Sequence, residues 1–161
     1  MKLATRLLLL CGSDPAGEGG DTPPRKWWFT IGGAAQVGES LAETAARELE
    51  EETGLLVSAD ALVGPVWRRD AIIDFNGSVV RSEEMYFVLR TTRFEPSDAG
   101  RSGLERTYIH GHRWCDATMI ATLVANGETV YPRQLGELLD EANALADAPG
   151  AQPAGPPQLI R

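Results

Sequence analysis

The sequence predicts a single α/β domain, built as a mixed α/β sandwich. Three observations lead to this fold class. Short apolar or β-branched stretches recur between turn residues, one well-capped helix interrupts them, and an amphipathic helix follows them near the end of the chain. The length of 161 residues suits one compact domain with a sizeable core.

Six stretches have the apolar, aromatic and β-branched composition of strands and end at turn residues. The first is apolar on both faces toward its end, which is typical of a central strand. The fourth and fifth are joined by Asn76-Gly77, a strong signal for a tight hairpin. The predicted strands are residues 1–11, 27–31, 61–68, 71–75, 78–93 and 108–115. Residues 12–26 and 94–103 are predicted to be connections, because they are rich in glycine, proline and polar residues.

Helices are predicted where a capping residue precedes an apolar periodicity. Ser40 is a good N-cap and Glu43 completes a capping box, so a helix should begin there, run to Thr53 and stop at Gly54. A short helix is predicted over residues 116–125. A last helix should begin at Pro132 and bury an apolar face formed by Leu135, Leu138, Leu139, Ala142 and Leu145. We therefore expect one domain over residues 1–147 and an Ala/Gly/Pro-rich, flexible tail over residues 148–161.

The charge balance argues against several classes of partner. The formal net charge is −8 and the isoelectric point is near 4.8. Nucleic acid polymers and anionic membranes both need a basic surface, so neither is an expected partner. A small phosphorylated substrate is compatible with this charge, because bound cations can reverse the charge of one pocket.

Cysteine usage and hydropathy suggest a compartment. Cys11 and Cys115 have neither metal-type nor disulfide-type spacing and are expected to be buried thiols. No stretch approaches the roughly 18 apolar residues of a membrane span. The apolar run over residues 7–12 is too short for a signal peptide, so a cytoplasmic protein is expected.

The central helix separates its side chains by type when it is placed on a wheel of about 100° per residue. An apolar stripe, expected to face the core, is formed by Leu41, Ala42, Ala45, Ala46 and Leu49. Glu48, Glu51 and Glu52 lie together on an adjoining arc, whereas Glu50 lies on the far side near Arg47. Clustered carboxylates repel one another and are placed at the negative end of the helix dipole. A hard divalent cation, Mg²⁺ or Mn²⁺, would relieve this repulsion, although the cluster alone is also compatible with a solvated acidic face.

The residues around this helix follow a fixed spacing. In order they are Gly33, five residues, Glu39, seven residues, Arg47-Glu48-Leu49, one residue, Glu51-Glu52, one residue and Gly54-Leu55. This pattern resembles the signature of the Nudix hydrolase family at every defining position from Gly33 to Leu55. Average residue usage gives a chance match on the order of 10⁻⁷ for this chain. The resemblance covers about residues 2–146 and departs from many members at Ile31, where they have proline, and at Gln36, where they have glutamate.

The resemblance implies a Nudix-type α/β/α sandwich with a mixed β-sheet, the motif helix and a C-terminal helix. It also implies a Mg²⁺- or Mn²⁺-dependent hydrolase that cleaves the diphosphate bond of a nucleoside diphosphate-linked substrate. The residues expected in catalysis are Arg47, Glu48, Glu51 and Glu52. The expected metal ligands are the Gly32 carbonyl, Glu48, Glu51, Glu52 and Glu105, the last of which is predicted at the end of a loop. Substrate contacts are expected at Gly33, Glu39 and Trp28, with Glu39 acting mainly to fix the loop.

Two other functions remain open. An isomerase of the same fold would need a dedicated Cys/His/Glu constellation, for which only Cys11, Cys115, His110 and His112 are available. A Nudix-like module that binds a nucleotide without turnover typically lacks ligand glutamates, and none is missing here. The sequence does not choose among nucleoside triphosphates, nucleotide sugars and other diphosphates. It also leaves open the general base, the number of metals and a homodimer.

Overall fold

The computed structural model describes residues 5–13, 26–75, 77–147 and 155–161. Predictions for residues 1–4, 14–25 and 148–154 and for Asn76 lie outside the described residues. In chain order the elements are β1 (Leu7–Ser13), β2 (Lys26–Phe29), α1 (Leu41–Thr53), a 3-10 turn η1 (Ala59–Ala61), β3 (Val63–Phe75), β4 (Ser78–Val88), α2 (Gly103–Tyr108), β5 (Ile109–Cys115), α3 (Ala117–Ala125), β6 (Thr129–Tyr131), α4 (Leu135–Ala146) and β7 (Gln158–Ile160).

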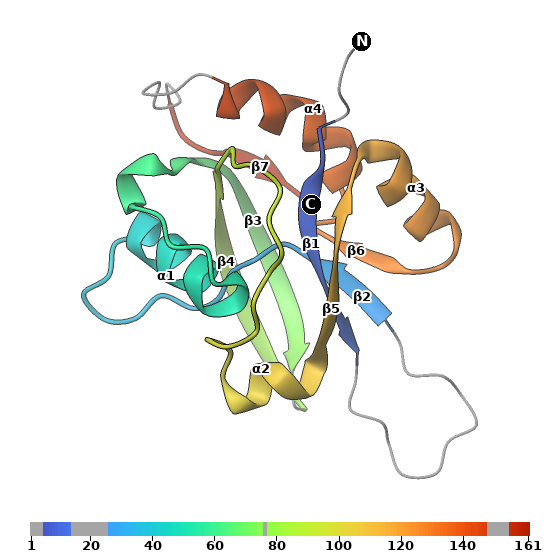
Figure 1. Ribbon diagram of the computed structural model, residues 1–161, viewed down its shortest axis with the longest axis horizontal. Helices are drawn as coiled ribbons and strands as arrows, with labels where there is room; N and C mark the ends of the chain where they lie inside the picture. Colours follow the sequence, from blue (N-terminus) through green and yellow to red (C-terminus); the bar gives the residue numbers. More distant parts are fainter. Residues whose placement is uncertain (1–4, 14–25, 76, 148–154) are drawn as a thin grey trace.

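The strands form two mixed sheets between flanking helices, so the predicted α/β sandwich is confirmed. One sheet has the order β5-β1-β2-β6 and the other has the order β4-β3-β7. The first sheet has two antiparallel pairs and the second has one, and each also has one parallel pair, β2 with β6 and β3 with β7. In Figure 1 α1 lies beyond the β3–β4 hairpin, α3 lies on the opposite side of the molecule, and α4 crosses one end. The β3–β4 hairpin does not join the sheet that contains β1 and pairs with β7 instead.

The structure joins two predicted strands and adds two elements that were not predicted. The strands expected at 61–68 and 71–75 are one continuous strand, β3, because Arg69 and Asp70 continue the ladder opposite Glu84 and Glu83. A short helix, α2, precedes the strand expected at 108–115 and was not predicted. The three-residue strand β6 was also not predicted, since its pairing with β2 is set by tertiary structure.

The end of the chain is ordered where a flexible tail was expected. Residues 158–160 form β7, which pairs in parallel with residues 67–69 of β3. Ile160 is only 4% exposed and belongs to the buried hydrophobic cluster. The flexible-tail prediction is therefore wrong for this segment, because one apolar side chain and a sheet edge were enough to anchor it.

The core lies around the central strands and the helices that cover them. Trp28 of β2 and Val130 of β6 are directly paired and share a buried cluster with Ile120 and Leu123 of α3. The predicted apolar face of α4 is confirmed, with Leu135, Leu138 and Leu139 buried. Cys11 and Cys115 are free and buried, as expected.

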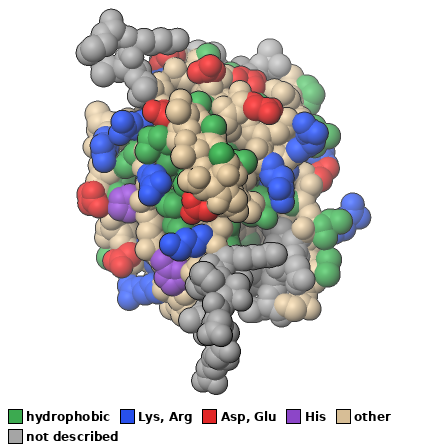
Figure 2. All heavy atoms as spheres, turned by 90° about the vertical axis from the view of Figure 1, so that its right-hand side faces the viewer, with side chains coloured by type: hydrophobic (Ala, Val, Ile, Leu, Met, Phe, Trp, Pro, Cys, Tyr) green, Lys and Arg blue, Asp and Glu red, His purple; other side chains and the backbone are tan. Residues whose placement is uncertain are grey.

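Charged side chains of both signs lie on the surface. On the face drawn in Figure 2, basic and acidic side chains are interspersed over the described residues, without a continuous basic stripe. Among the described residues, no helix has the length and apolar character needed to cross a membrane.

Candidate active site

The motif helix α1 begins and ends where its capping residues predict. The Ser40 hydroxyl accepts a hydrogen bond from the Glu43 amide at 3.1 Å, and the Glu43 carboxylate accepts one from the Ser40 amide at 2.7 Å. Gly54 ends the helix in the left-handed conformation, with φ of 80°, and its amide donates to the Glu50 carbonyl. The sequence therefore sets both ends of α1 locally, and this fixes which side chains face inward.

The buried face of α1 is formed by polar residues and corrects the predicted apolar stripe. Glu48 is 8% exposed and Glu52 is 2% exposed, whereas Leu41, expected in the core, is exposed. Thr44 continues the buried row at the i, i+4, i+8 spacing of one helix face. Burying carboxylates is unfavourable unless something compensates the charge. A helix that turns two glutamates inward therefore indicates a site for a cation.

Gly32 and Gly33 lie directly against these two carboxylates. The Gly32 amide donates a hydrogen bond to Glu52 Oε2 at 3.2 Å, so the contact uses its N–H and not the carbonyl predicted as a ligand. A Cβ at Gly33 would overlap the Glu48 carboxylate, with Oε2 at only 2.7 Å. A side chain at residue 33 would therefore force the Glu48 carboxylate to move from its present position.

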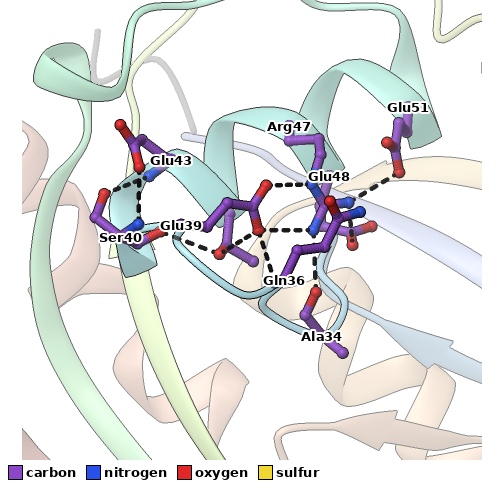
Figure 3. Close-up of polar contacts among 9 residues, drawn as sticks. Ala34, Gln36, Glu39, Ser40, Glu43, Arg47, Glu48 and Glu51 are labelled. Atoms are coloured by element: carbon purple, nitrogen blue, oxygen red, sulfur yellow. Dashed lines mark hydrogen bonds and ion pairs between the residues drawn. The ribbon is translucent and has the colours of Figure 1, made fainter.

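Arg47 joins the loop to the helix through several carboxylates (Figure 3). Its Nε and Nη2 donate to Glu39 at 2.6 and 3.1 Å, and Nη2 also donates to the Ala34 carbonyl. Its Nη1 contacts Glu48 Oε1 at 2.8 Å and Glu51 Oε2 at 3.1 Å. On the helical wheel Arg47 lies on the far side with Glu50, but its ion pairs within α1 are with Glu48 and Glu51. The long side chain folds back over the carboxylate face.

Glu39 is held within the loop network, which agrees with its expected role in fixing the loop. Besides Arg47, it accepts hydrogen bonds from the Gln36 amide and the Thr44 hydroxyl, both at 2.9 Å. The hydrogen bond from Arg47 and that from the Gln36 amide lower the pKa of Glu39 to about 2. This carboxylate is fully ionised at neutral pH and fixes the loop ahead of α1.

Glu105 was predicted at the end of a loop, but it lies in helix α2. It occupies the third position of α2, where it forms a capping box with Ser102 at 3.1 and 3.2 Å. Its second oxygen, Oε2, is buried and has no hydrogen-bond partner among the described residues. Glu105 contributes to the negative charge that acts on Glu48 and Glu52, so the three carboxylates are neighbours. An unpaired buried oxygen beside two buried carboxylates is the kind of donor that a cation would satisfy.

The loop before α2 packs on the C-terminal end of α1. The Ser97 amide donates to the Thr53 carbonyl at 2.8 Å, and Arg101 Nε donates to the Glu52 carbonyl at 3.0 Å. Gly100 lies so close to the backbone of Glu51 that a Cβ would come within 2.9 Å of its carbonyl oxygen. These contacts satisfy carbonyls at the helix end, where α1 has no basic residue of its own.

Burial makes the inward carboxylates hard to ionise. Loss of water around Glu52, reinforced by Glu48 and Glu105, raises the pKa of Glu52 to about 8. Burial also raises the pKa of Glu48, although Arg47 opposes this. Burial and the same three glutamates raise the pKa of the nearby Tyr108 to about 12. Desolvation and mutual repulsion therefore both favour a bound cation here.

The donor set fits a hard divalent cation in kind but is not yet gathered around one point. Carboxylate oxygens are the ligands that Mg²⁺ and Mn²⁺ prefer. Within the described residues, however, no three acidic, histidine or cysteine side chains already converge on a common ion position. Arg47 Nη1 contacts one oxygen of each of two carboxylates, Glu48 Oε1 and Glu51 Oε2. The second oxygen of each carboxylate is left for a cation, so Arg47 and a cation can be bound together.

A large cavity extends from the carboxylates between the two sheets. Its volume is about 2270 Å³, well above the roughly 300–1,000 Å³ of an ordinary ligand pocket. Trp28, predicted to contact substrate, is 7% exposed and packs in the core, where its Nε1 donates to Glu128 at 3.2 Å. Trp27 lines the cavity in its place. The sequence could not show which of two adjacent tryptophans faces inward to the core, because both are apolar and strands alternate their faces.

The comparisons with known proteins agree with this geometry. The model of the NUDIX domain matches residues 3–134, which include every residue of the site described above. A search of curated proteins found no match to the chain. Because one family model covers most of the sequence and the site keeps its glycines, its arginine and its glutamates, the chain belongs to the NUDIX family of hydrolases that act on nucleoside diphosphate-linked substrates.

Proposed function

We propose that the chain is a Mg²⁺- or Mn²⁺-dependent hydrolase that cleaves the diphosphate bond of a small nucleoside diphosphate-linked molecule. The observation that supports this most directly is the burial of Glu48 and Glu52 against Gly32 and Gly33. These carboxylates do not form a solvated acidic face, because they are among the least exposed polar side chains of the described residues. Their burial becomes favourable when a divalent cation is bound.

Each residue then has a specific part in the reaction. Glu48, Glu52 and Glu105 would hold the cation from the buried side, and Glu51, which is half-exposed, from the open side. The bound cation would reduce the negative charge on the diphosphate oxygens and lower the pKa of the attacking water. Arg47 orients Glu48 and Glu51, and one of the helix glutamates accepts the proton of the water.

Charge and cysteine usage suggest the substrate size and the compartment of the reaction. The net charge of −8 suits a small substrate carried with its cation better than a nucleic acid polymer or an anionic membrane. Two free, buried thiols suit the reducing environment of the cytoplasm.

The two alternatives receive less support. An isomerase would need a cysteine or histidine beside the carboxylates, but Cys11 and Cys115 both belong to the buried hydrophobic cluster. A binding module without turnover would have no use for the buried oxygen of Glu105 together with two buried glutamates.

Turnover of a diphosphate panel tests the proposal against both alternatives. The panel contains nucleoside triphosphates, nucleotide sugars and dinucleoside polyphosphates, assayed for released phosphate or pyrophosphate with Mg²⁺, with Mn²⁺ and with EDTA. We expect turnover only with divalent metal and a loss of at least about 100-fold in Glu48→Gln. Glu50→Gln is the matched control, because Glu50 is exposed on the same helix, and it should stay within about threefold of wild type. Tight nucleotide binding without turnover, or equal losses at Glu48 and Glu50, would overturn the proposal.

A further inference from the structure

Strands β2 and β6 present an aromatic surface to the cavity. Phe29 is paired with Tyr131 and Trp27 with Thr129, so these alternate positions share one face of the sheet. The residues between them, Trp28 and Val130, point to the other face and are buried. Trp27, Phe29 and Tyr131 all line the cavity that also contains Glu48 and Glu52.

Gly12 of the neighbouring strand makes room for this aromatic surface. It is paired with Trp27, and a Cβ there would lie 2.7 Å from Trp27 Nε1 and 3.1 Å from a ring carbon of Phe29. Glycine at this place leaves room for atoms of both rings close to β1. Trp27 and Phe29, together with Tyr131, form the aromatic platform of the cavity.

The facing strands β3 and β4 supply a fixed polar wall. Arg69 makes a two-pronged ion pair with Glu84 at 2.8 and 3.1 Å, and the Tyr86 hydroxyl donates to the same carboxylate at 2.7 Å. The Arg69 guanidinium lies 5.5 Å from the centre of the Tyr131 ring, so the two walls meet at this point. The Arg69–Glu84–Tyr86 network is satisfied internally and holds its side chains in place.

The indole N–H of Trp67 in this wall is unpaired among the described residues. Trp67, on the same face of β3 as Arg69, is 4% exposed and lines the cavity. Its indole Nε1 makes no hydrogen bond to any described residue. A buried, unpaired N–H is unfavourable, and a ligand with an acceptor atom would satisfy it.

The platform lies within reach of the carboxylates. Gly32, whose amide contacts Glu52, is three residues beyond Phe29 on the same strand and loop. Three residues span at most about 11 Å, and Tyr131 lies one strand away, a further distance of about 5 Å. A molecule with a diphosphate at Glu52 and a ring a few bonds away can therefore reach Tyr131.

We propose that Trp27, Phe29 and Tyr131 stack against the base of the nucleotide substrate, and that Trp67 Nε1 donates a hydrogen bond to an acceptor on that base. This inference rests on the proposed function, because it assigns the non-reacting part of the same substrate. Aromatic side chains and guanidinium groups both stack on bases, and Arg133 adds a second guanidinium at 5.7 Å from the Tyr131 ring. An aliphatic or purely phosphorylated molecule would leave both the platform and the Trp67 donor unused.

Calorimetric titration with products tests the base site apart from catalysis. The probes are the four nucleoside monophosphates and ribose 5-phosphate, all in Mg²⁺, because none of them contains a diphosphate bond to be cleaved. At least one nucleoside monophosphate should bind about tenfold or more tightly than ribose 5-phosphate. Trp27→Leu and Tyr131→Leu should remove that difference, whereas Trp27→Phe and Tyr131→Phe, which keep a ring, should retain most of it.

Two further variants separate the hydrogen bond from general destabilisation. Trp67→Phe keeps an aromatic ring but removes the N–H, and it should weaken nucleotide binding by about fivefold or more while leaving ribose 5-phosphate unaffected. Trp28→Phe is the matched control, since Trp28 is buried on the other face of β2 and its Nε1 already donates to Glu128 at 3.2 Å, so nucleotide binding should be unchanged. Equal affinity for ribose 5-phosphate and every nucleotide, or unchanged nucleotide binding in Trp27→Leu and Trp67→Phe, would overturn the inference. Turnover of the diphosphate panel by the same samples would show that the proposed function survives that result.

Discussion

The clearest quantitative test concerns the cost of burying Glu52. Its pKa is raised from 4.5 to about 8, mainly by burial, and one pKa unit corresponds to about 1.36 kcal/mol. The unfolded chain releases this proton near pH 4.5, whereas the folded, metal-free protein keeps it until about pH 8. The folded state therefore binds more protons in this window, so its free energy of unfolding falls as the pH rises. The full loss is about 5 kcal/mol, a large part of the roughly 5–15 kcal/mol that stabilises an ordinary domain.

Glu52→Gln removes the titrating group while keeping its shape. The amide oxygen can still accept the Gly32 hydrogen bond seen at 3.2 Å. In EDTA, urea unfolding should give similar free energies for wild type and Glu52→Gln at pH 4.5. At pH 8 to 9 the variant should be more stable by up to about 5 kcal/mol. Glu39 does not confuse the comparison, because its lowered pKa of about 2 adds stability only as the pH rises toward 4.5.

Added Mg²⁺ should change the difference in the free energy of unfolding between wild type and Glu52→Gln in favour of wild type. A cation that binds only the folded protein stabilises wild type, and it should stabilise Glu52→Gln much less because the variant lacks one charge. The advantage of Glu52→Gln at pH 8 should therefore be smaller in millimolar Mg²⁺ than in EDTA. If wild type and Glu52→Gln show parallel pH profiles in EDTA, the reasoning about the buried carboxylate is refuted.

Three other outcomes are expected. Saturating Mg²⁺ should raise the melting temperature of wild type by several degrees, because it relieves repulsion among buried carboxylates; calorimetry that shows no shift would favour a solvated acidic face. Glu105→Gln should weaken apparent metal affinity in metal-dependent turnover by more than about tenfold, because it alters a buried oxygen with no partner. Wild-type behaviour at limiting Mg²⁺ would place the fourth carboxylate elsewhere. Ile160→Ala should lower the free energy of unfolding by about 2–4 kcal/mol, since Ile160 is buried against β3; Leu159→Ala, at an exposed neighbour, is its control, and equal small effects would mean that β7 contributes little.

The parts of the fold that the sequence predicted well are those with local determinants. Ser40, Glu43 and Gly54 define α1 through contacts within a few residues, and the structure reproduces each contact. The same signal was present at Ser102 and Glu105, which form a second capping box and begin α2. This capping box does not by itself predict a helix, because α2 has only six residues and follows a glycine-containing loop.

The parts that the sequence did not predict depend on long-range contacts. Strands β6 and β7 have three residues each. They form because β2 and β3 each have one edge that no other strand occupies. The inward direction of Glu48 and Glu52 also lies outside the reach of a helical wheel. A wheel ranks side chains by hydrophobicity and so assigned the leucine and alanine stripe to the core. At a functional site polar side chains can be buried in place of apolar ones, and the burial of Glu48 and Glu52 is therefore the most informative feature of α1.

The contacts of residues 97–101 with the end of α1 have a consequence for how this protein could vary. Ser97 and Arg101 are bonded to the carbonyls of Thr53 and Glu52, and α2 begins immediately afterwards. The position of Glu105 relative to Glu52 is thus set by the number of residues in this short segment. An insertion or deletion of one residue here would move a carboxylate out of the site, although every side chain in it could be kept. Among related chains, we therefore expect the length of this segment to be inherited together with the acidic residue that follows it, and a different length to accompany a carboxylate drawn from another element.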